Sequence, residues 1–214
     1  MSNAELLVVY EDDDQETAEF ISTLNRHHAL RTIQAPAGTS LGALRNLAVN
    51  SARSDVVVQW DDDDWYAAER LAIQLDAMEE SRAAACLLSR WTIYDVVTSR
   101  AFISHYRAWE GSLMAQRGAL GGYDDNLTKC EDTPVVEALL ERGDIVFVDR
   151  PDLYVYVYHG RNTWDRGHWE EIFDASTPLS SSDAAHIAEQ LNKGAGQVGA
   201  SLPSVRVDGR QTGR

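Results

Sequence analysis

Cysteine and basic side chains are scarce in this sequence. Its 214 residues include two cysteines, Cys86 and Cys130. Two thiols are too few for a disulfide-built scaffold or for a four-thiolate metal centre. Lysine and arginine together number 19 against 34 aspartates and glutamates, so the formal net charge is −15. A chain this acidic lacks the basic surface that nucleic acid or an anionic membrane requires, so we expect neither as its main partner.

Long apolar runs are also missing. No segment approaches the roughly 18 consecutive apolar residues that a membrane-spanning helix needs. Residues 1–14, MSNAELLVVYEDDD, contain one short apolar run and no basic residue, unlike a secretory signal peptide. We therefore expect no membrane span and a cytoplasmic location.

Short β-branched runs alternate with amphipathic segments along most of the chain. This alternation predicts an α/β fold with a mostly parallel sheet flanked by helices. The expected strands are 6–10, 30–34, 55–60, two or three within 83–106, 145–148 and 154–158, and the expected helices are 16–25, 41–51, 67–80, 132–142 and 183–192. Thr39 or Ser40 would cap the helix at 41–51, and Gly143 would end the helix at 132–142.

The strongest local signal is a run of four aspartates, Asp61 to Asp64, between Trp60 and Trp65. Four adjacent carboxylates repel one another unless a cation or hydrogen bonds relieve them. Oxygen-rich clusters of this kind suit Mg²⁺ or Mn²⁺, and ligands of open α/β sheets bind beyond the carboxyl ends of strands. The alternative is a solvated acidic turn. The preceding buried strand and the two tryptophans favour a metal site.

Three stretches together resemble a family 2 glycosyltransferase of the GT-A type, over roughly residues 6–165. The first is LGALRNLAVNSARSDVVVQWDDDDWYAAERLAIQ, with an Arg-Asn helix, a strand, an Asp-x-Asp motif and a further helix. The second is GGYDDNLTKCEDTPVVEALLERG, with a Glu-Asp pair at the start of a helix, and the third is YVYVYHGRNTW. Each motif alone is weak, but the three in this order are fairly specific.

The resemblance implies a metal-dependent, inverting transfer of a sugar from a nucleotide-sugar donor to the hydroxyl of a saccharide or other acceptor. By position it implies that Asp132 is the catalytic base, that Asp61, Asp63 and His159 hold Mn²⁺ or Mg²⁺, that Glu11, Asp12, Arg45, Asn46, Asp62 and Asp64 contact the donor, and that Trp109, Glu110 and Glu131 contact the acceptor or sugar. The chemistry agrees, because a divalent ion offsets charge on a diphosphate leaving group and an attacking hydroxyl needs a base.

Several of these residues have an ordinary structural alternative. Asp132 could be a carboxylate that favours a helix N-terminus. Arg45 could be a surface arginine and His159 a structural histidine. Core packing is the more frequent fate of tryptophans such as Trp65 and Trp109.

The resemblance also predicts the domain organisation. We expect a GT-A-like glycosyltransferase domain over 1–175, a helical segment over 176–192 and a disordered tail over 193–214. The stretch 5–14 aligns with the family's second strand and acidic turn, with about four residues before it. This predicts a domain that lacks the family's first strand. One alternative is therefore a truncated, inactive domain that binds nucleotide or metal. Another is a nucleotidyltransferase, although no Gly-rich phosphate loop is visible.

Overall fold

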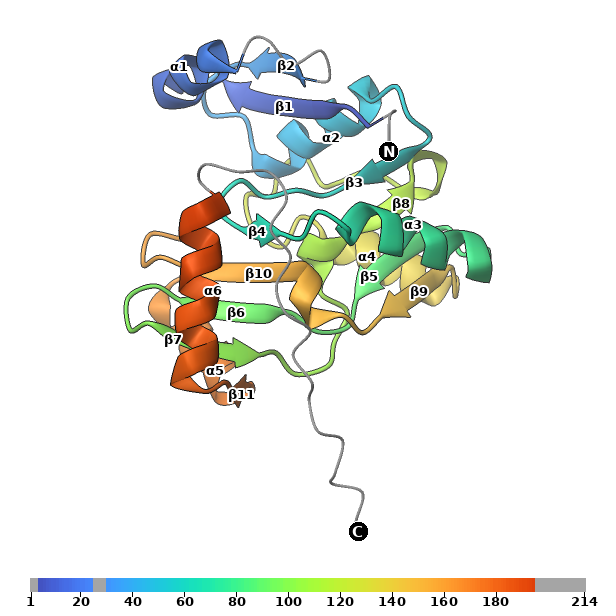
Figure 1. Cartoon of the computed structure of the whole chain (residues 1–214). Helices are drawn as coiled ribbons and strands as arrows, with labels where there is room; N and C mark the ends of the chain where they lie inside the picture. Colours follow the sequence, from blue (N-terminus) through green and yellow to red (C-terminus); the bar gives the residue numbers. More distant parts are fainter. Residues whose placement is uncertain (1–3, 25–29, 195–214) are drawn as a thin grey trace. The chain divides into compact units, whose positions relative to one another are not determined.

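The computed structural model describes residues 4–24 and 30–194, which form two compact units (Figure 1). Each unit gathers segments that are far apart in sequence. Unit 1 comprises Met1–Trp60, Gln74–Leu87 and Glu110–Phe147, and unit 2 comprises Asp61–Ile73, Leu88–Trp109 and Val148–Arg214. Most of the expected tail lies outside the described residues. The division at residues 175 and 192 stays a prediction.

Unit 1 contains a two-stranded parallel sheet, β1 (Leu6–Glu11) and β2 (Leu30–Ala35), with Val8 opposite Thr32. Helix α1 (Gln15–Thr23) begins where the Asp14 carboxylate accepts a hydrogen bond from the Thr17 amide at 3.0 Å. Helix α2 (Leu41–Ser51) is capped in the same way by Ser40 and packs against β1 (Figure 1).

The second sheet of unit 1 has the order β3-β8-β5-β9. Its strands are β3 (Val56–Val58), β5 (Ala85–Leu88), β8 (Met114–Gln116) and β9 (Ile145–Val148), accompanied by the 3-10 helices η1 (Glu110–Ser112) and η2 (Arg117–Ala119) and by helix α4 (Thr133–Glu141). Strand β8 runs antiparallel to both β3 and β5. Helix α3 (Arg70–Ser81) contributes residues to both units.

Unit 2 is built on a five-stranded sheet of order β11-β7-β6-β10-β4. The strands are β4 (Trp65–Tyr66), β6 (Thr92–Asp95), β7 (Arg100–Ile103), β10 (Tyr154–Tyr158) and β11 (Thr177–Pro178). The 3-10 helix η3 (Pro151–Leu153) precedes β10, helix α5 (Arg166–Asp174) lies between β10 and β11 in sequence, and helix α6 (Ser181–Gly194) follows β11. Strands β6 and β10 are parallel, and β4 and β7 run antiparallel to their neighbours. Helix α6 lies across β6 and β7 (Figure 1).

The core of unit 2 is unusually aromatic. Trp91 packs on Trp109 and on Tyr154 with ring centroids 4.5 and 4.3 Å apart, and Trp169 is fully buried beside Tyr156 and Tyr158. Large rings bury much apolar surface per residue, so this short sheet acquires a rigid core.

The structure confirms the alternation of strands and helices and gives mixed rather than mostly parallel pairing. Its 83–106 stretch forms three strands, as expected. Helix α5 and strand β8 were not predicted, and Asp132 precedes α4 as its N-cap instead of lying inside the helix. Within residues 4–24 and 30–194, no helix is long and apolar enough to cross a membrane.

Candidate active site

The four aspartates form a turn directly before β4, in unit 2. Asp63 Oδ2 lies 3.2 Å from His159 Nε2, on the loop that follows β10. The same oxygen accepts a longer hydrogen bond, 3.4 Å, from Asn162 Nδ2, which also donates to the Val157 carbonyl. The Asp63 side chain is 45% exposed. The structure thus places Asp63 beside His159, two of the expected metal ligands, and adds Asn162, which sequence reasoning missed.

The two ends of the aspartate turn are held by tyrosine hydroxyls. Tyr66 Oη accepts a hydrogen bond from the Asp61 amide at 2.9 Å and donates to the Asp61 carbonyl at 3.2 Å. The Asp64 carboxylate accepts hydrogen bonds from Tyr154 Oη and, at 2.8 Å, from the Val157 amide. Burial raises the pKa of the Asp64 carboxyl well above its usual range. Both Asp64 oxygens therefore bind protein donors and fix the turn to β10.

A buried arginine lies behind the same turn. Arg70 is fully buried, and its guanidinium lies 4.6 Å from the ring centroid of Tyr66 and 5.3 Å from that of Tyr154. Burial lowers the pKa of Arg70, while the two tyrosines and Asp61 act in the opposite direction. Burial also raises the pKa of the Tyr154 hydroxyl, which keeps it protonated as a donor. Arg70 supplies a positive charge that offsets part of the repulsion among the aspartates.

The aspartate turn has the donor chemistry of a hard-cation site. No group of three or more His, Cys, Asp or Glu side chains in the described part of the chain is already arranged to hold a metal ion. Mg²⁺ is commonly bound through one or two carboxylates and takes its other ligands from substrate phosphates and water. The Asp63 carboxylate would be such a ligand, with the His159 imidazole nitrogen beside it and Asp61 two residues away in sequence.

The Glu131–Asp132 pair lies in unit 1, immediately before α4. Glu131 is 3% exposed and forms an ion pair with Arg45, with Nε 2.6 Å from Oε1. Asp132 is half-buried and accepts a hydrogen bond from Gln59 Nε2 at 3.2 Å. The Asp132 side chain makes no capping hydrogen bond to α4, so helix capping does not account for its orientation. Gln59 is a second contact that sequence reasoning missed.

Other predicted residues of unit 1 bind its own backbone. Glu11 Oε1 accepts hydrogen bonds from the amides of Gly38 and Thr39, and Asp12 Oδ1 accepts one from Ala37 at 3.0 Å. Asn46 binds both backbone groups of Tyr123. Each of these side chains holds a loop that follows a strand or a 3-10 helix.

The structure supports core packing, and not sugar contact, for the two tryptophans Trp109 and Trp65. Trp109 is 3% exposed, stacks on Trp91 and donates from Nε1 to the His105 carbonyl at 3.1 Å. So little exposed ring leaves almost no face for a sugar, whereas the following Glu110, at the start of η1, is partly exposed. Trp65 is partly buried and packs against the same core.

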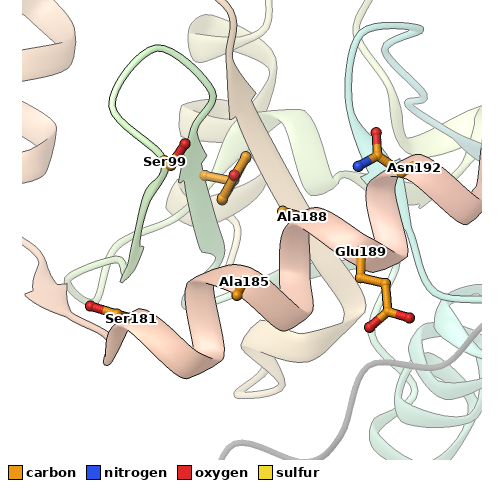
Figure 2. Close-up of a pocket in the computed structure, with 7 residues that line it drawn as sticks. Ser99, Ser181, Ala185, Ala188, Glu189 and Asn192 are labelled. Carbon is orange, nitrogen blue, oxygen red and sulfur yellow. The ribbon is translucent and has the colours of Figure 1, made fainter.

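A pocket of about 490 Å³ lies elsewhere in unit 2, between α6 and the β6–β7 hairpin (Figure 2). Figure 2 shows Ser181, Ala185, Ala188, Glu189 and Asn192 along one side of α6, with Ser99 on the hairpin opposite. None of the predicted site residues lines this pocket.

Comparison with known proteins gives one family match. A family described as glycosyl transferase family 2 matches residues 1–132. No curated protein sequence matches the chain significantly.

Solved structures show the fold. Residues 1–349 of TarS from S. aureus match with a TM-score of 0.57 and 13% identity, over 91% of this chain and 66% of that one. The same protein in complex with UDP-GlcNAc matches with a TM-score of 0.59 and 14% identity, over 88% and 63%. GalNAc-T7 with UDP, GalNAc and Mn²⁺ matches with a TM-score of 0.54 and 14% identity, over 72% and 38%. The chain thus spans less than two thirds of the length of these structures, and its α/β fold is GT-A-like.

Proposed function

This chain belongs to glycosyl transferase family 2, and we propose that it transfers a sugar from a nucleotide-sugar donor to an acceptor hydroxyl with inversion, assisted by Mn²⁺ or Mg²⁺. The observation that carries this proposal is the Asp63–His159 pair on a turn held by Tyr66 and Tyr154. A turn fixed before any ligand binds presents its carboxylates without further ordering, which lowers the entropy lost on binding.

Each acidic segment has a separate part in this proposal. Asp61, Asp63 and His159 would hold the cation, which supplies charge neutralisation at the diphosphate leaving group. Asp132 would accept the proton of the acceptor hydroxyl as that oxygen attacks the anomeric carbon. Gln59 binds one oxygen of the Asp132 carboxylate. Its hydrogen bond would keep the other oxygen oriented for the proton.

The related structures suggest which donors to test first. TarS is matched in complex with UDP-GlcNAc, and GalNAc-T7 is matched in complex with UDP, GalNAc and Mn²⁺. We therefore propose a UDP-linked sugar as the first candidate donor. GDP-linked sugars are the natural comparison set, because they differ in the base and share the diphosphate.

The direct test is nucleoside diphosphate release from a panel of UDP- and GDP-sugars, with Mn²⁺ and with EDTA. We expect Mn²⁺-dependent release by the parent chain and by Asp55→Ala, which changes a fully exposed aspartate. Asp63→Ala should release nothing. Release that persists in EDTA or in Asp63→Ala would overturn the metal assignment. Metal-dependent binding of UDP without release from any donor would instead indicate a binding domain without turnover.

A further inference from the structure

Helix α2 binds a long irregular segment through one of its faces. Residues 120–131, here called the 120–131 loop, connect η2 to α4 and contain no helix or strand. The α2 side of this contact consists of Ser40, Gly42, Arg45 and Asn46, all within unit 1. About 80 residues of sequence separate α2 from the loop, so the local sequence pattern of neither segment predicts the contact.

Asn46 provides the central contact. Its Oδ1 accepts a hydrogen bond from the Tyr123 amide at 2.8 Å, and its Nδ2 donates to the Tyr123 carbonyl at 2.7 Å. Nδ2 also donates to Asp125 Oδ1 at 2.6 Å. A side-chain amide thus replaces the neighbouring strand that this stretch of backbone lacks, because it supplies both a donor and an acceptor to one residue.

Gly42 and Arg45, which precede Asn46 on α2, hold later parts of the loop. Gly42 donates its amide proton to the Leu127 carbonyl at 3.0 Å, and a Cβ at this position would lie 2.0 Å from the Asp124 carbonyl oxygen. The helix therefore requires glycine here for the loop to approach. At the other end Arg45 pairs with buried Glu131, the residue directly before Asp132. The contacts thus extend from Tyr123 to Glu131, which precedes the candidate base in sequence.

We propose that Asn46 and Arg45 are positioning residues, which hold the 120–131 loop so that Asp132 keeps its catalytic orientation, and not contacts to the donor. Both side chains are already engaged by the loop: Arg45 faces an oppositely charged buried partner, and Asn46 binds three loop atoms through its amide. A buried ion pair that loses one partner is strongly destabilised, so these contacts should persist throughout the reaction. This inference rests on the proposed function, in which Asp132 is the base.

The test is Asn46→Asp, which keeps the shape and the acceptor but removes both donors and places a second charge beside Asp125. The matched control is Asn50→Asp, the same change at an exposed position one turn further along α2. Amide hydrogen exchange in the 120–131 loop should speed up by about tenfold or more in Asn46→Asp and stay at the parent rate in Asn50→Asp. Turnover should fall by about tenfold or more in Asn46→Asp, with the donor Kd within about twofold of the parent value.

Two results would overturn the proposal. One is a large rise in donor Kd with parent-like exchange in the loop, which would make Asn46 a donor contact. The other is faster exchange with unchanged turnover, which would reduce the contact to loop packing. Failure of the proposed function can be told apart from these results. If the parent chain transfers no sugar, the proposed function fails, while amide hydrogen exchange still shows whether Asn46 holds the 120–131 loop. Arg45→Lys provides a second variant that keeps the charge beside Glu131 and should show a smaller change of the same kind.

Discussion

The aspartate turn at 61–64 and the Glu131–Asp132 pair are both acidic, but the structure holds them by different means. The aspartate turn is fixed by Tyr66 and Tyr154, whose rings belong to a dense aromatic core and contact the buried cation Arg70. The Glu131–Asp132 pair ends an irregular loop that depends on polar contacts to one face of α2. Core burial gives rigidity, whereas polar contacts on a loop permit local opening.

This difference suggests a division of labour. A cation and a diphosphate need ligands that do not move, because charged groups held out of position stabilise the transition state much less. The base acts on the acceptor hydroxyl and not on the leaving group. We therefore expect substitutions behind the aspartate turn to change stability and donor binding together. Substitutions around Asp132 should change turnover with little effect on donor binding.

The largest expected effect is that of Asp132→Asn. This change keeps the shape of the side chain and removes its basicity, so turnover should fall by about 10²- to 10⁴-fold. Glu137→Gln, an exposed change of the same kind on α4, should transfer sugar at the parent rate. The measurement is steady-state transfer at saturating donor. Parent-like turnover in Asp132→Asn would move the base elsewhere, with Glu110 as the next candidate.

Arg70→Met should produce the second largest effect. It removes the cation between Tyr66 and Tyr154, and desolvated cation–π contacts contribute about 2 kcal/mol or more. Arg90→Met is the control, since Arg90 also stacks on a tyrosine, Tyr106, at 4.4 Å, but this ring is mostly exposed. This substitution also removes an ion pair with Asp149 at 2.7 Å, which makes the comparison a stringent one. The exposed pair should be worth about 0.5–1 kcal/mol.

Urea unfolding of both arginine variants, together with Mn²⁺-dependent donor binding, measures the difference. We expect Arg70→Met to lose more stability and to bind donor more weakly than Arg90→Met. Equal losses in the two variants would show that the buried arginine has no special relation to the aspartate turn.

The smallest of these effects should come from Tyr154→Phe. The change removes one hydroxyl donor from the Asp64 carboxylate and preserves the ring packing. An acceptor left without its partner costs about 1–3 kcal/mol, so thermal unfolding should shift downward by several degrees. Tyr158→Phe, a change in the same aromatic cluster, should shift it less. Identical melting curves for parent and Tyr154→Phe would contradict the anchoring of the turn by Tyr154.

The sequence predicted well the helices and strands whose apolar spacing and capping residues lie within a few residues of one another. The helix expected at 41–51 and the strands at 145–148 and 154–158 match α2, β9 and β10 residue for residue. Their apolar spacing and the Ser40 cap are visible within a few residues. Helix α5 also carried a signal, since Asp165 caps it and Trp169, Ile172 and Phe173 follow helical spacing, but the polar residues between them obscured it.

The site could be predicted only in part, because sequence indicates residue types and not their partners. Family resemblance named Asp63 and His159 as ligands of one cation, and the structure places their side chains 3.2 Å apart, while the metal role stays a prediction. The engagement of Arg45 with Glu131, of Asn46 with Tyr123 and of Asp64 with Tyr154 joins residues 77 to 90 positions apart. Such contacts depend on how the chain folds back on itself. Trp109 illustrates the same limit, since an exposed and a buried tryptophan look alike in a sequence.

The division of labour itself is tested most directly by calorimetric titration of one nucleotide-sugar, in the presence of Mn²⁺, into the parent chain, Asp63→Ala and Asp132→Asn. We predict that donor binding disappears in Asp63→Ala and that its Kd in Asp132→Asn stays within about twofold of the parent value, because only the first residue acts on the leaving group. Undiminished Mn²⁺-dependent binding by Asp63→Ala, or its loss in Asp132→Asn, would contradict the account.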